Sequence, residues 1–325
     1  MKTFSIVIPV YQNETNIEQT VSECLQLISK ITELSVEIVF VDDGSTDRSL
    51  ALLKEAQKKH PKIIKLIKFT KNSGQPAATL AGMIHAKGDA IGVISADSQD
   101  PFDLFIPMLK DWQSGKKLII ASRIKRSDGV VGDFMSQLFY RLIRKFVVSN
   151  YPMGGFDFFI VDRVIVEHLE KIREKNGHIV MLIFSLGYSF TVHPYERKPR
   201  LSGKSQYTFW RKIKVFYDAF IANTYAPIRF VTATGAISAV ASLSFGGYVA
   251  LSWFYKGQQT TGWASIVVLV SFFSGLILLS LGILGEYLWR IYEEVRNRPR
   301  YIIDEVIDAP KIEKSETKNQ YAVRN

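Results

Sequence analysis

Two short acidic segments follow apolar runs in the N-terminal third of the chain, and their side chains could bind a nucleotide. Val41-Asp42-Asp43-Gly44-Ser45-Thr46-Asp47 ends the run at 37–41, and Ser95-Ala96-Asp97-Ser98-Gln99-Asp100-Pro101 ends the run at 90–96. A carboxylate at the carboxyl end of a strand can accept hydrogen bonds from base N–H groups or ribose hydroxyls. A simple helix-capping turn would use the same residues in the first segment, so this alternative stays open.

The second segment also carries oxygen ligands at a spacing that suits a divalent cation. Asp97 and Gln99 lie two residues apart, so on an extended segment both side chains would point to one side. Mg²⁺ and Mn²⁺ prefer carboxylate and carbonyl oxygens. A cation held there could bridge a diphosphate and neutralise the charge that develops as the diphosphate leaves. The alternative is a second Asp-rich turn that binds no metal.

Apolar runs that alternate with helical patterns must position these segments. Strands are expected at 4–10, 37–41, 63–69, 90–96 and 117–122, and helices at 15–31, 49–59 and 75–86. Uninterrupted apolar strands separated by helices predict a parallel sheet that helices cover on both faces. The predicted fold class is therefore α/β, with ligands at the carboxyl ends of the strands.

Composition narrows the class of protein. The 325 residues include 41 Lys and Arg against 31 Asp and Glu, a net charge of +10, which favours an anionic partner such as nucleic acid, an anionic membrane leaflet or a phosphorylated substrate. The single cysteine, Cys24, excludes an intramolecular disulfide framework and a cysteine-based zinc site. The five histidines are scattered without HxxxH or similar ligand spacing, which argues against a histidine metal site.

Two uncharged stretches in the second half predict transmembrane helices. Residues 230–255 and 263–285 carry no formal charge, and each is longer than the roughly 20 residues that cross a bilayer. Core helices of a large soluble domain are the alternative. Cations gather before the first stretch and after the second, whereas the loop between them carries Lys256. The positive-inside rule then places both termini in the cytoplasm, in an integral protein of the inner or plasma membrane.

The residues before the first stretch predict an amphipathic helix in the headgroup plane. Phe209, Ile213, Phe216 and Phe220 recur at helical spacing, and basic residues occupy other positions on the wheel. An ordinary surface helix is the alternative. The predicted organisation is an α/β domain at 1–205, a juxtamembrane helix at 206–228, two transmembrane helices within 229–290 (about 230–255 and 263–287) and a cytoplasmic tail at 291–325.

The order of the motifs resembles the family 2 glycosyltransferases of the GT-A fold. The resemblance is carried by Pro9-Val10-Tyr11, the Asp42 segment, Lys71-Asn72-Ser73-Gly74-Gln75, the Asp97 segment, Gly155-Phe156-Asp157-Phe158-Phe159-Ile160-Val161-Asp162-Arg163, Tyr195-Glu196-Arg197 and Gly203-Lys204-Ser205-Gln206-Tyr207. A two-helix hairpin after these motifs narrows it to polyprenyl-phosphate glycosyltransferases, such as dolichyl-phosphate mannose synthase and the bactoprenol glucosyltransferases. The resemblance covers about residues 3–300.

The resemblance implies a role for each matching residue. Pro9, Tyr11, Glu14, Asp42 and Asp43 would surround the nucleotide base, with Asp42 hydrogen-bonded to it. Ser95, Ala96, Asp97 and Gln99 would line the donor diphosphate, and Asp97 and Gln99 would hold Mg²⁺ or Mn²⁺. Arg123 would contact the donor or acceptor phosphate, and Arg197, Arg200, Lys204 and Ser205 would form a basic loop near the phosphates. Asp157 would be the active-site carboxylate, and Asp157 and Asp97 together would be the catalytic residues.

Two departures from the family pattern affect the site. Ser95 stands where the family commonly has the first Asp of Asp-Ala-Asp, so the metal site has one carboxylate fewer. Phe159 stands where the family has an Arg, which removes a possible phosphate contact.

The function that the resemblance implies is the transfer of one hexose, with inversion, from a nucleotide sugar to a polyprenyl phosphate at the cytoplasmic membrane face. UDP-glucose is the expected donor, and GDP-mannose, UDP-GlcNAc or a UDP-aminosugar are alternatives. A processive polysaccharide synthase would normally show Gln-x-x-Arg-Trp, which this sequence lacks. A membrane-tethered nucleotide-binding protein that has lost catalysis is the rival of another class. We expect a homo-oligomer and no nucleic-acid partner.

Overall fold

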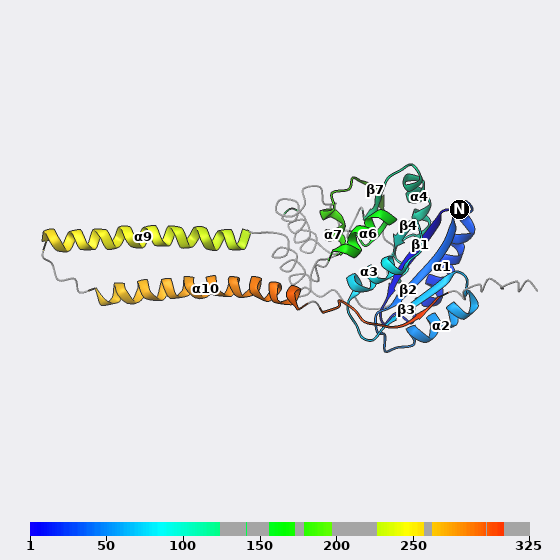
Figure 1. Ribbon diagram of the computed structural model, residues 1–325, viewed down its shortest axis with the longest axis horizontal. Coiled ribbons are helices and arrows are strands. Elements are labelled where there is room, and N and C mark those ends of the chain that lie inside the picture. Colours follow the sequence, from blue (N-terminus) through cyan, green and yellow to red (C-terminus); the bar gives the residue numbers. More distant parts are fainter. Residues whose placement is uncertain are drawn as a thin grey trace, which may run out of the picture.

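An eight-stranded mixed sheet organises the described residues of this computed structural model, which are 1–123, 141, 156–172, 179–196, 226–256, 262–296 and 298–308 (Figure 1). The strands are β1 Thr3–Val10, β2 Ser35–Asp42, β3 Ile64–Phe69, β4 Ala90–Val93, β5 Leu118–Arg123, β6 Phe158–Asp162, β7 Phe190–Tyr195 and β8 Ile303–Ile307. Their order across the sheet is β7-β5-β6-β4-β1-β2-β3-β8. β6 runs antiparallel to β4 and β5, and β8 runs antiparallel to β3, whereas the other pairs are parallel. The predicted α/β class with a mainly parallel sheet is confirmed.

Helices cover both faces of the sheet because alternate strand residues point to opposite sides. They are α1 Ile17–Lys30, α2 Ser49–Lys59, α3 Gln75–His85, α4 Phe105–Gln113, α6 Arg163–Lys171 and α7 Ile179–Ser185. Val7 of β1 packs in the cluster formed with α3, α6 and α7, whereas its neighbours Ile6 and Ile8 pack in the cluster formed with α1, α2 and α4. The three helices predicted at 15–31, 49–59 and 75–86 are confirmed as α1, α2 and α3.

The carboxyl end of β4 differs from the prediction. The strand ends at Val93 rather than at residue 96, and the residues after it form a turn. Ser98 in that turn has a φ of 50°, a left-handed conformation that a strand does not use. The extended geometry expected for Asp97 and Gln99 was therefore wrong. A turn lets the segment fold back toward β1, as its hydrogen bonds show below.

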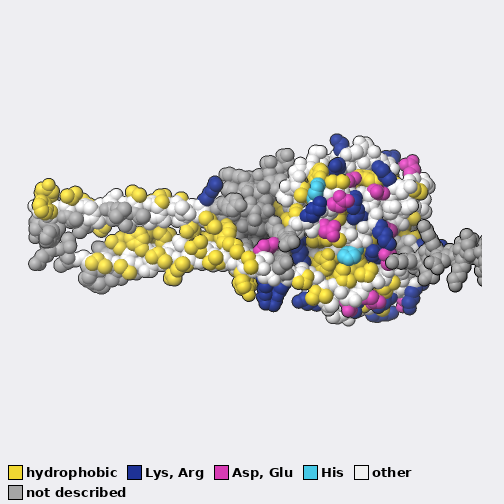
Figure 2. Space-filling view, viewed as in Figure 1, with side chains coloured by type: hydrophobic (Ala, Val, Ile, Leu, Met, Phe, Trp, Pro, Cys, Tyr) yellow, Lys and Arg dark blue, Asp and Glu magenta, His cyan; other side chains and the backbone are white. Residues whose placement is uncertain are grey.

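Two long helices project from the α/β domain and run side by side (Figure 1). They are α9 Ala226–Lys256 and α10 Trp263–Val295. Among the described residues, one helix is long and apolar enough to cross a membrane, through Phe272–Trp289 of α10, with a mean hydropathy of 1.6 and 0% of the window buried. Apolar side chains gather along the projecting helices in Figure 2. The predicted second span, in α9, stays a prediction.

Strand β8 comes from the segment after α10 and covers the edge of the sheet. It lies within residues 291–325, which the sequence predicted to be a tail, so that range contributes a strand to the domain. Its contacts include Lys54 Nζ with Glu305 at 2.6 Å and Lys68 Nζ with Asp304 at 2.5 Å. Two residues before the strand, the Tyr301 ring stacks on Phe69 with 4.9 Å between centroids. Because an uncovered edge strand exposes unpaired backbone groups, β8 protects β3 and ties α10 to the domain.

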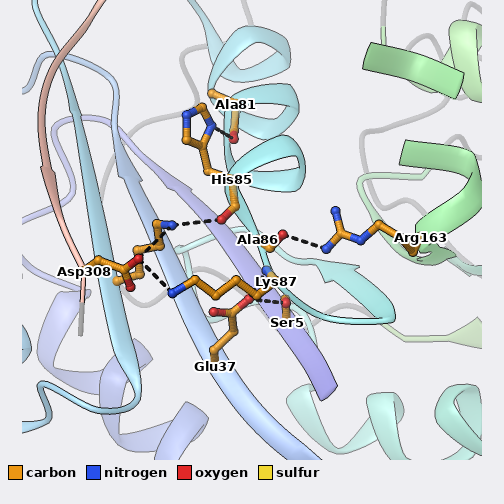
Figure 3. A network of polar contacts seen from close by, with 9 residues as sticks. Ser5, Glu37, Ala81, His85, Ala86, Lys87, Arg163 and Asp308 are labelled. Carbon is orange, nitrogen blue, oxygen red and sulfur yellow. Dashed lines mark hydrogen bonds and ion pairs between the residues drawn. The ribbon is translucent and has the colours of Figure 1, made fainter. Parts of the chain in front are cut away.

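A polar network joins the end of this segment to the amino ends of the strands (Figure 3). Asp308 accepts hydrogen bonds from Lys87 Nζ at 2.8 Å and from Lys65 Nζ at 3.4 Å. The backbone N–H of Lys87 donates to Glu37, whose Oε1 also accepts from the Ser5 hydroxyl at 2.5 Å. This network lies at the sheet edge opposite the carboxyl ends of the parallel strands. It therefore supports the fold at a distance from the segments that the sequence assigned to chemistry.

Candidate active site

The acidic segments after β2 and β4 meet through the residues that follow β1. Val10 and Asp42 are register partners at the ends of β1 and β2. The backbone N–H of Gln12 donates to Ser45 Oγ at 3.1 Å, and Asn13 Nδ2 donates to the carbonyl of Ala96 at 2.5 Å. The turn after β1 is thus hydrogen-bonded to the Asp42 segment on one side and to the Asp97 segment on the other. The structure brings the two segments together at one edge of the sheet, as the topology predicted.

Asp42 and Asp43 are both buried but differ in what their carboxylates bind. Both oxygens of Asp43 accept backbone N–H groups, from Ser73 at 2.6 Å and from Gly74 at 2.8 Å. Asp42 Oδ2 accepts the N–H of Ser45 at 3.3 Å, whereas no hydrogen-bond donor among the described residues reaches the buried Oδ1. A buried acceptor without a donor is costly unless a ligand supplies one. Asp42 therefore has one oxygen without a donor from the described residues, whereas Asp43 uses both of its oxygens to hold the loop after β3.

Burial also affects how these two carboxyl groups titrate. Burial raises the pKa of Asp42, and the hydrogen bonds from Ser45 oppose that rise. Burial likewise raises the pKa of Asp43, and its backbone hydrogen bonds oppose the rise. Both groups therefore take up a proton at a higher pH than exposed aspartates do.

Gly44 allows the chain to turn sharply between these aspartates and α2. Its φ is +70°, and a Cβ added there would lie 2.6 Å from the backbone carbon of Lys71. A residue with a side chain would meet both backbone strain and the adjacent loop. The glycine in the Asp42 segment thus has a structural reason that does not depend on a ligand.

The other residues expected around the base lie at the same edge. Pro9 is the second-last residue of β1, and Tyr11, which directly follows the strand, is half-buried. Glu14 is exposed, and its Oε2 accepts the backbone N–H of Arg48 at 2.9 Å, immediately before α2. The carboxylate of Glu14 thus caps a helix, which is a role that the sequence reasoning did not assign to it.

The segment after β4 presents oxygen atoms that suit a hard cation. Asp97 Oδ1 accepts the Ser95 hydroxyl at 2.6 Å and the backbone N–H of Gln99 at 3.3 Å. Ser95 therefore donates to Asp97 instead of supplying a second carboxylate. Among the described residues, no group of three or more His, Cys, Asp or Glu side chains is placed to hold a metal. The donor set fits a cation that takes most of its ligands from a bound diphosphate and water.

Arg123 connects the remaining candidate residues. Arg123 Nη2 lies 3.3 Å from Asp157 Oδ2, and the arginine side chain is 10% exposed against 48% for the aspartate. Arg123 Nε donates to the Tyr195 hydroxyl at 3.2 Å, and that hydroxyl donates to Asp100 Oδ1 at 2.6 Å. The structure thus brings Asp157 next to Arg123, and it adds Tyr195 and Asp100, whose contacts sequence reasoning missed.

Four predicted phosphate-binding residues fall in a segment outside the described residues. They are Arg197, Arg200, Lys204 and Ser205. Most of the predicted juxtamembrane helix at 206–228 also falls there, and its last three residues belong to α9. Their expected roles stay predictions.

The fold is that of an α/β protein, and the candidate site residues lie at the carboxyl ends of its strands, where proteins of this class bind ligands. Residues 5–170 match the profile of the family described as Glycosyl transferase family 2. The chain therefore belongs to this family and is a glycosyltransferase.

Relatives match almost the full length of the chain. It is 33% identical over 303 residues to an uncharacterized glycosyltransferase, YkcC, of Bacillus subtilis, which covers 92% of this chain and 93% of the relative. It is 31% identical over 303 residues to the SfII prophage-derived bactoprenol glucosyl transferase of Shigella flexneri, with 92% and 96% covered. The crystal structure of glucosyl-3-phosphoglycerate synthase from Mycobacterium tuberculosis matches with a TM-score of 0.50 at 16% identity, over 67% of this chain and 79% of that one. This last likeness shows a shared GT-A-like fold.

Proposed function

We propose that the protein transfers one glucose from UDP-glucose to a polyprenyl phosphate at the cytoplasmic face of the membrane, with inversion. The observation that carries the proposal is the end of the sheet where the parallel strands finish. There the buried Asp42 Oδ1, which no hydrogen-bond donor of the described residues reaches, and the Arg123 guanidinium lie on the two sides of the Asp97 segment. A nucleotide sugar bound near Asp42 and an anionic acceptor bound near Arg123 would have their reacting groups next to the Asp97 segment. Relatives named bactoprenol glucosyl transferases support the lipid acceptor.

The donor half of the site would read the nucleotide through hydrogen bonds. Asp42 Oδ1 would accept a base N–H, and Pro9 and Tyr11 would flank the base. Uracil and guanine both carry an N–H that a carboxylate can accept, so this contact suits UDP- and GDP-sugars alike. The names of the relatives support glucose as the sugar, UDP is the nucleotide that we propose with it, and GDP-mannose, UDP-GlcNAc and UDP-aminosugars are the alternatives to test.

Asp97 and Gln99 would hold a divalent cation against the donor diphosphate. Bound there, Mg²⁺ or Mn²⁺ would offset the negative charge that develops on the leaving UDP. Because the protein supplies one carboxylate, the diphosphate oxygens would be needed to complete the coordination. We therefore expect the cation to bind far more tightly with the donor than without it.

The acceptor needs little help from a base. A phosphate monoester has a second pKa of about 6, so it is largely a dianion at neutral pH. One phosphate oxygen would form a bond to the anomeric carbon as the bond from that carbon to the β-phosphate oxygen of UDP breaks. UDP leaves with the electron pair, and no proton has to move. Asp157, held 3.3 Å from Arg123, would therefore position the arginine or a sugar hydroxyl rather than act as an essential base.

The projecting helices would bring this site to the lipid headgroups. A polyprenyl tail leaves the bilayer at a cost of about 0.8 kcal/mol per buried CH₂, so the enzyme must work at the membrane. We propose that α9 and α10 both cross the bilayer as a hairpin, with the α/β domain and both termini in the cytoplasm. The uncharged stretch 230–255 in α9 and the exposed apolar window in α10 support this arrangement.

A radiolabel transfer assay tests the proposal. Purified full-length protein in detergent is incubated with undecaprenyl phosphate, Mg²⁺ or Mn²⁺ and a panel of UDP- and GDP-sugars. We expect label to enter the lipid from UDP-glucose and EDTA to abolish the transfer. Label from a different donor would correct the sugar. Nucleotide binding without transfer from any donor would instead favour the catalytically inactive alternative, and Ser95→Asp would then be the variant to test for restored activity.

A further inference from the structure

We propose that the Tyr195 hydroxyl holds the Arg123 guanidinium in the orientation that binds the phosphate of the lipid acceptor. Tyr195 is then a positioning residue, because it acts through Arg123 and not on the substrate. The identity of that phosphate rests on the proposed function. The hydrogen-bonded chain Asp100–Tyr195–Arg123–Asp157 carries the inference.

The geometry gives the tyrosine one orientation of its proton. Arg123 and Tyr195 are register partners at the ends of the parallel strands β5 and β7. The hydroxyl proton of Tyr195 points to Asp100 Oδ1 at 2.6 Å, so its lone pairs remain to accept Arg123 Nε at 3.2 Å. Arginine cannot accept a hydrogen bond, which excludes the reverse arrangement. Asp100 thus orients the hydroxyl, and the hydroxyl orients the guanidinium.

The hydrogen bond between Arg123 and Tyr195 is buried, and burial increases the cost of losing it. Asp100 is 2% exposed, Tyr195 6% and the Arg123 side chain 10%, so water replaces a lost partner poorly. Burial and the adjacent Asp100 raise the pKa of Tyr195 above its usual range, and the hydroxyl keeps its proton at working pH. The ion pair of Arg123 with Asp157 is half-exposed and contributes less to its orientation. Without the Tyr195 hydroxyl, the guanidinium would lose its buried anchor.

The position of these four hydrogen-bonded residues in the sheet indicates that they lie on the acceptor side of the site. Asp42 ends β2 and the Asp97 segment follows β4, so the base and diphosphate of the donor would occupy that half of the edge. β5 and β7 lie beyond β6, on the far side of β4 from β2. The sequence after Tyr195 continues through the basic segment at 197–205 toward α9. The lipid phosphate would therefore arrive on the side where Arg123 lies.

Asp100 also links the donor side of the site to the acceptor side. It belongs to the turn that carries Asp97 and Gln99, so one tyrosine hydroxyl connects the cation-binding turn to the acceptor arginine. A shift of the turn would move Tyr195 and hence Arg123. This link predicts that changes at Tyr195 alter acceptor binding more than donor binding, because the donor half keeps its own contacts to Asn13 and Ser45.

The test measures binding of farnesyl phosphate, a short water-soluble polyprenyl phosphate, to full-length protein in detergent by calorimetry. Tyr195→Phe removes one oxygen and keeps the ring that packs against Phe158. We expect this variant to raise the Kd for farnesyl phosphate about 10-fold, since a buried hydrogen bond to a charged group is lost. Tyr188→Phe is the matched control, because that hydroxyl meets His168 Nδ1 at 3.1 Å, away from the site. It should leave the Kd unchanged.

A double-variant cycle separates positioning from a general structural role. If Tyr195 acts through Arg123, adding Tyr195→Phe to Arg123→Lys should raise the Kd no further. An unchanged Kd in Tyr195→Phe, an additive loss in the double variant or no binding of farnesyl phosphate by the native protein would each overturn the inference. Native protein that binds farnesyl phosphate with the expected cycle, yet transfers no sugar, would refute the proposed function and leave the inference standing. Thermal unfolding of each variant identifies any that fails to fold, and Arg123→Gln then replaces Arg123→Lys.

Discussion

Replacing Asp42 by Asn should weaken UDP binding and change its response to pH. The carboxylate has two oxygens for two tasks, because Oδ2 accepts the N–H of Ser45 and Oδ1 is buried without a donor from the described residues. Asparagine offers one acceptor oxygen, so either the Ser45 N–H or the base N–H would lose its partner. A hydrogen bond to a charged acceptor contributes about 1.5–3 kcal/mol, and we expect the Kd for UDP to rise at least about 10-fold.

The sign of the pH effect follows from burial. Burial raises the pKa of Asp42, although the Ser45 hydrogen bonds oppose the rise. Protonation removes the charged acceptor, so UDP affinity of the native protein should fall as the pH is lowered through this pKa. In the Asp42→Asn variant this part of the pH dependence should be absent, because the amide does not titrate.

Calorimetric titration of UDP at several pH values checks both statements. Asp47→Asn is the matched control from the same segment, since its carboxylate accepts the backbone N–H groups of Ser49 at 3.0 Å and Glu14 at 3.2 Å at the helix start. It should keep an affinity close to the native one, and its affinity should still fall on acidification, but at a lower pH, because the Asp47 charge that helps to raise the pKa of Asp42 is removed. An Asp42→Asn variant with unchanged affinity, or with the native pH response, would refute the assignment of Asp42 to the base.

Three further outcomes are expected. Gly82→Ala should lower the free energy of unfolding by about 1–3 kcal/mol, because the added Cβ would lie 2.3 Å from Val7 Cγ1 in the core; unchanged denaturant unfolding would contradict this packing. Tyr301→Ala should lower the melting temperature in detergent more than Asp304→Asn does, since the Tyr301 ring stacks on Phe69 of β3 whereas Asp304 forms a surface ion pair with Lys68. The reverse order would contradict the larger contribution of the stacked ring. Gln99→Leu should raise the Mn²⁺ concentration for half-maximal transfer while UDP binding without metal stays native; an unchanged Mn²⁺ requirement would exclude this ligand.

Much of the fold could be predicted from the sequence because its signals are local. β1 and β2 are mostly apolar runs, and β3 is apolar apart from Lys65 and Lys68. These strands alternate with amphipathic helices, which is the pattern of a covered parallel sheet. β8 escaped prediction because Ile303–Ile307 is short, carries two consecutive acidic residues and follows a helix that was expected to be the last element. Only its pairing with β3, far away in the sequence, makes it a strand. β7 contains Pro194 and exposed positions and gives an equally weak local signal.

The candidate site shows the same division. Asp42, Asp97 and Arg123 could be selected because each ends or follows an apolar run, where α/β proteins bind ligands. The different tasks of Asp42 and Asp43 could not, because they depend on the loop at Ser73 and Gly74 that the fold brings to Asp43. Tyr195 could not be selected either, since its contact with Arg123 depends on the register of β5 and β7. Their catalytic roles stay predictions until they are measured.

Mass spectrometry of the lipid product tests the central claim most directly. Full-length protein in detergent is incubated with undecaprenyl phosphate, UDP-glucose and Mn²⁺. The lipid is then extracted and its molecular mass is determined. We predict a lipid phosphate heavier by a single hexose, with no longer products at extended times. A lipid with no added hexose would contradict the proposed transfer, and a ladder of several hexoses would show a processive synthase instead.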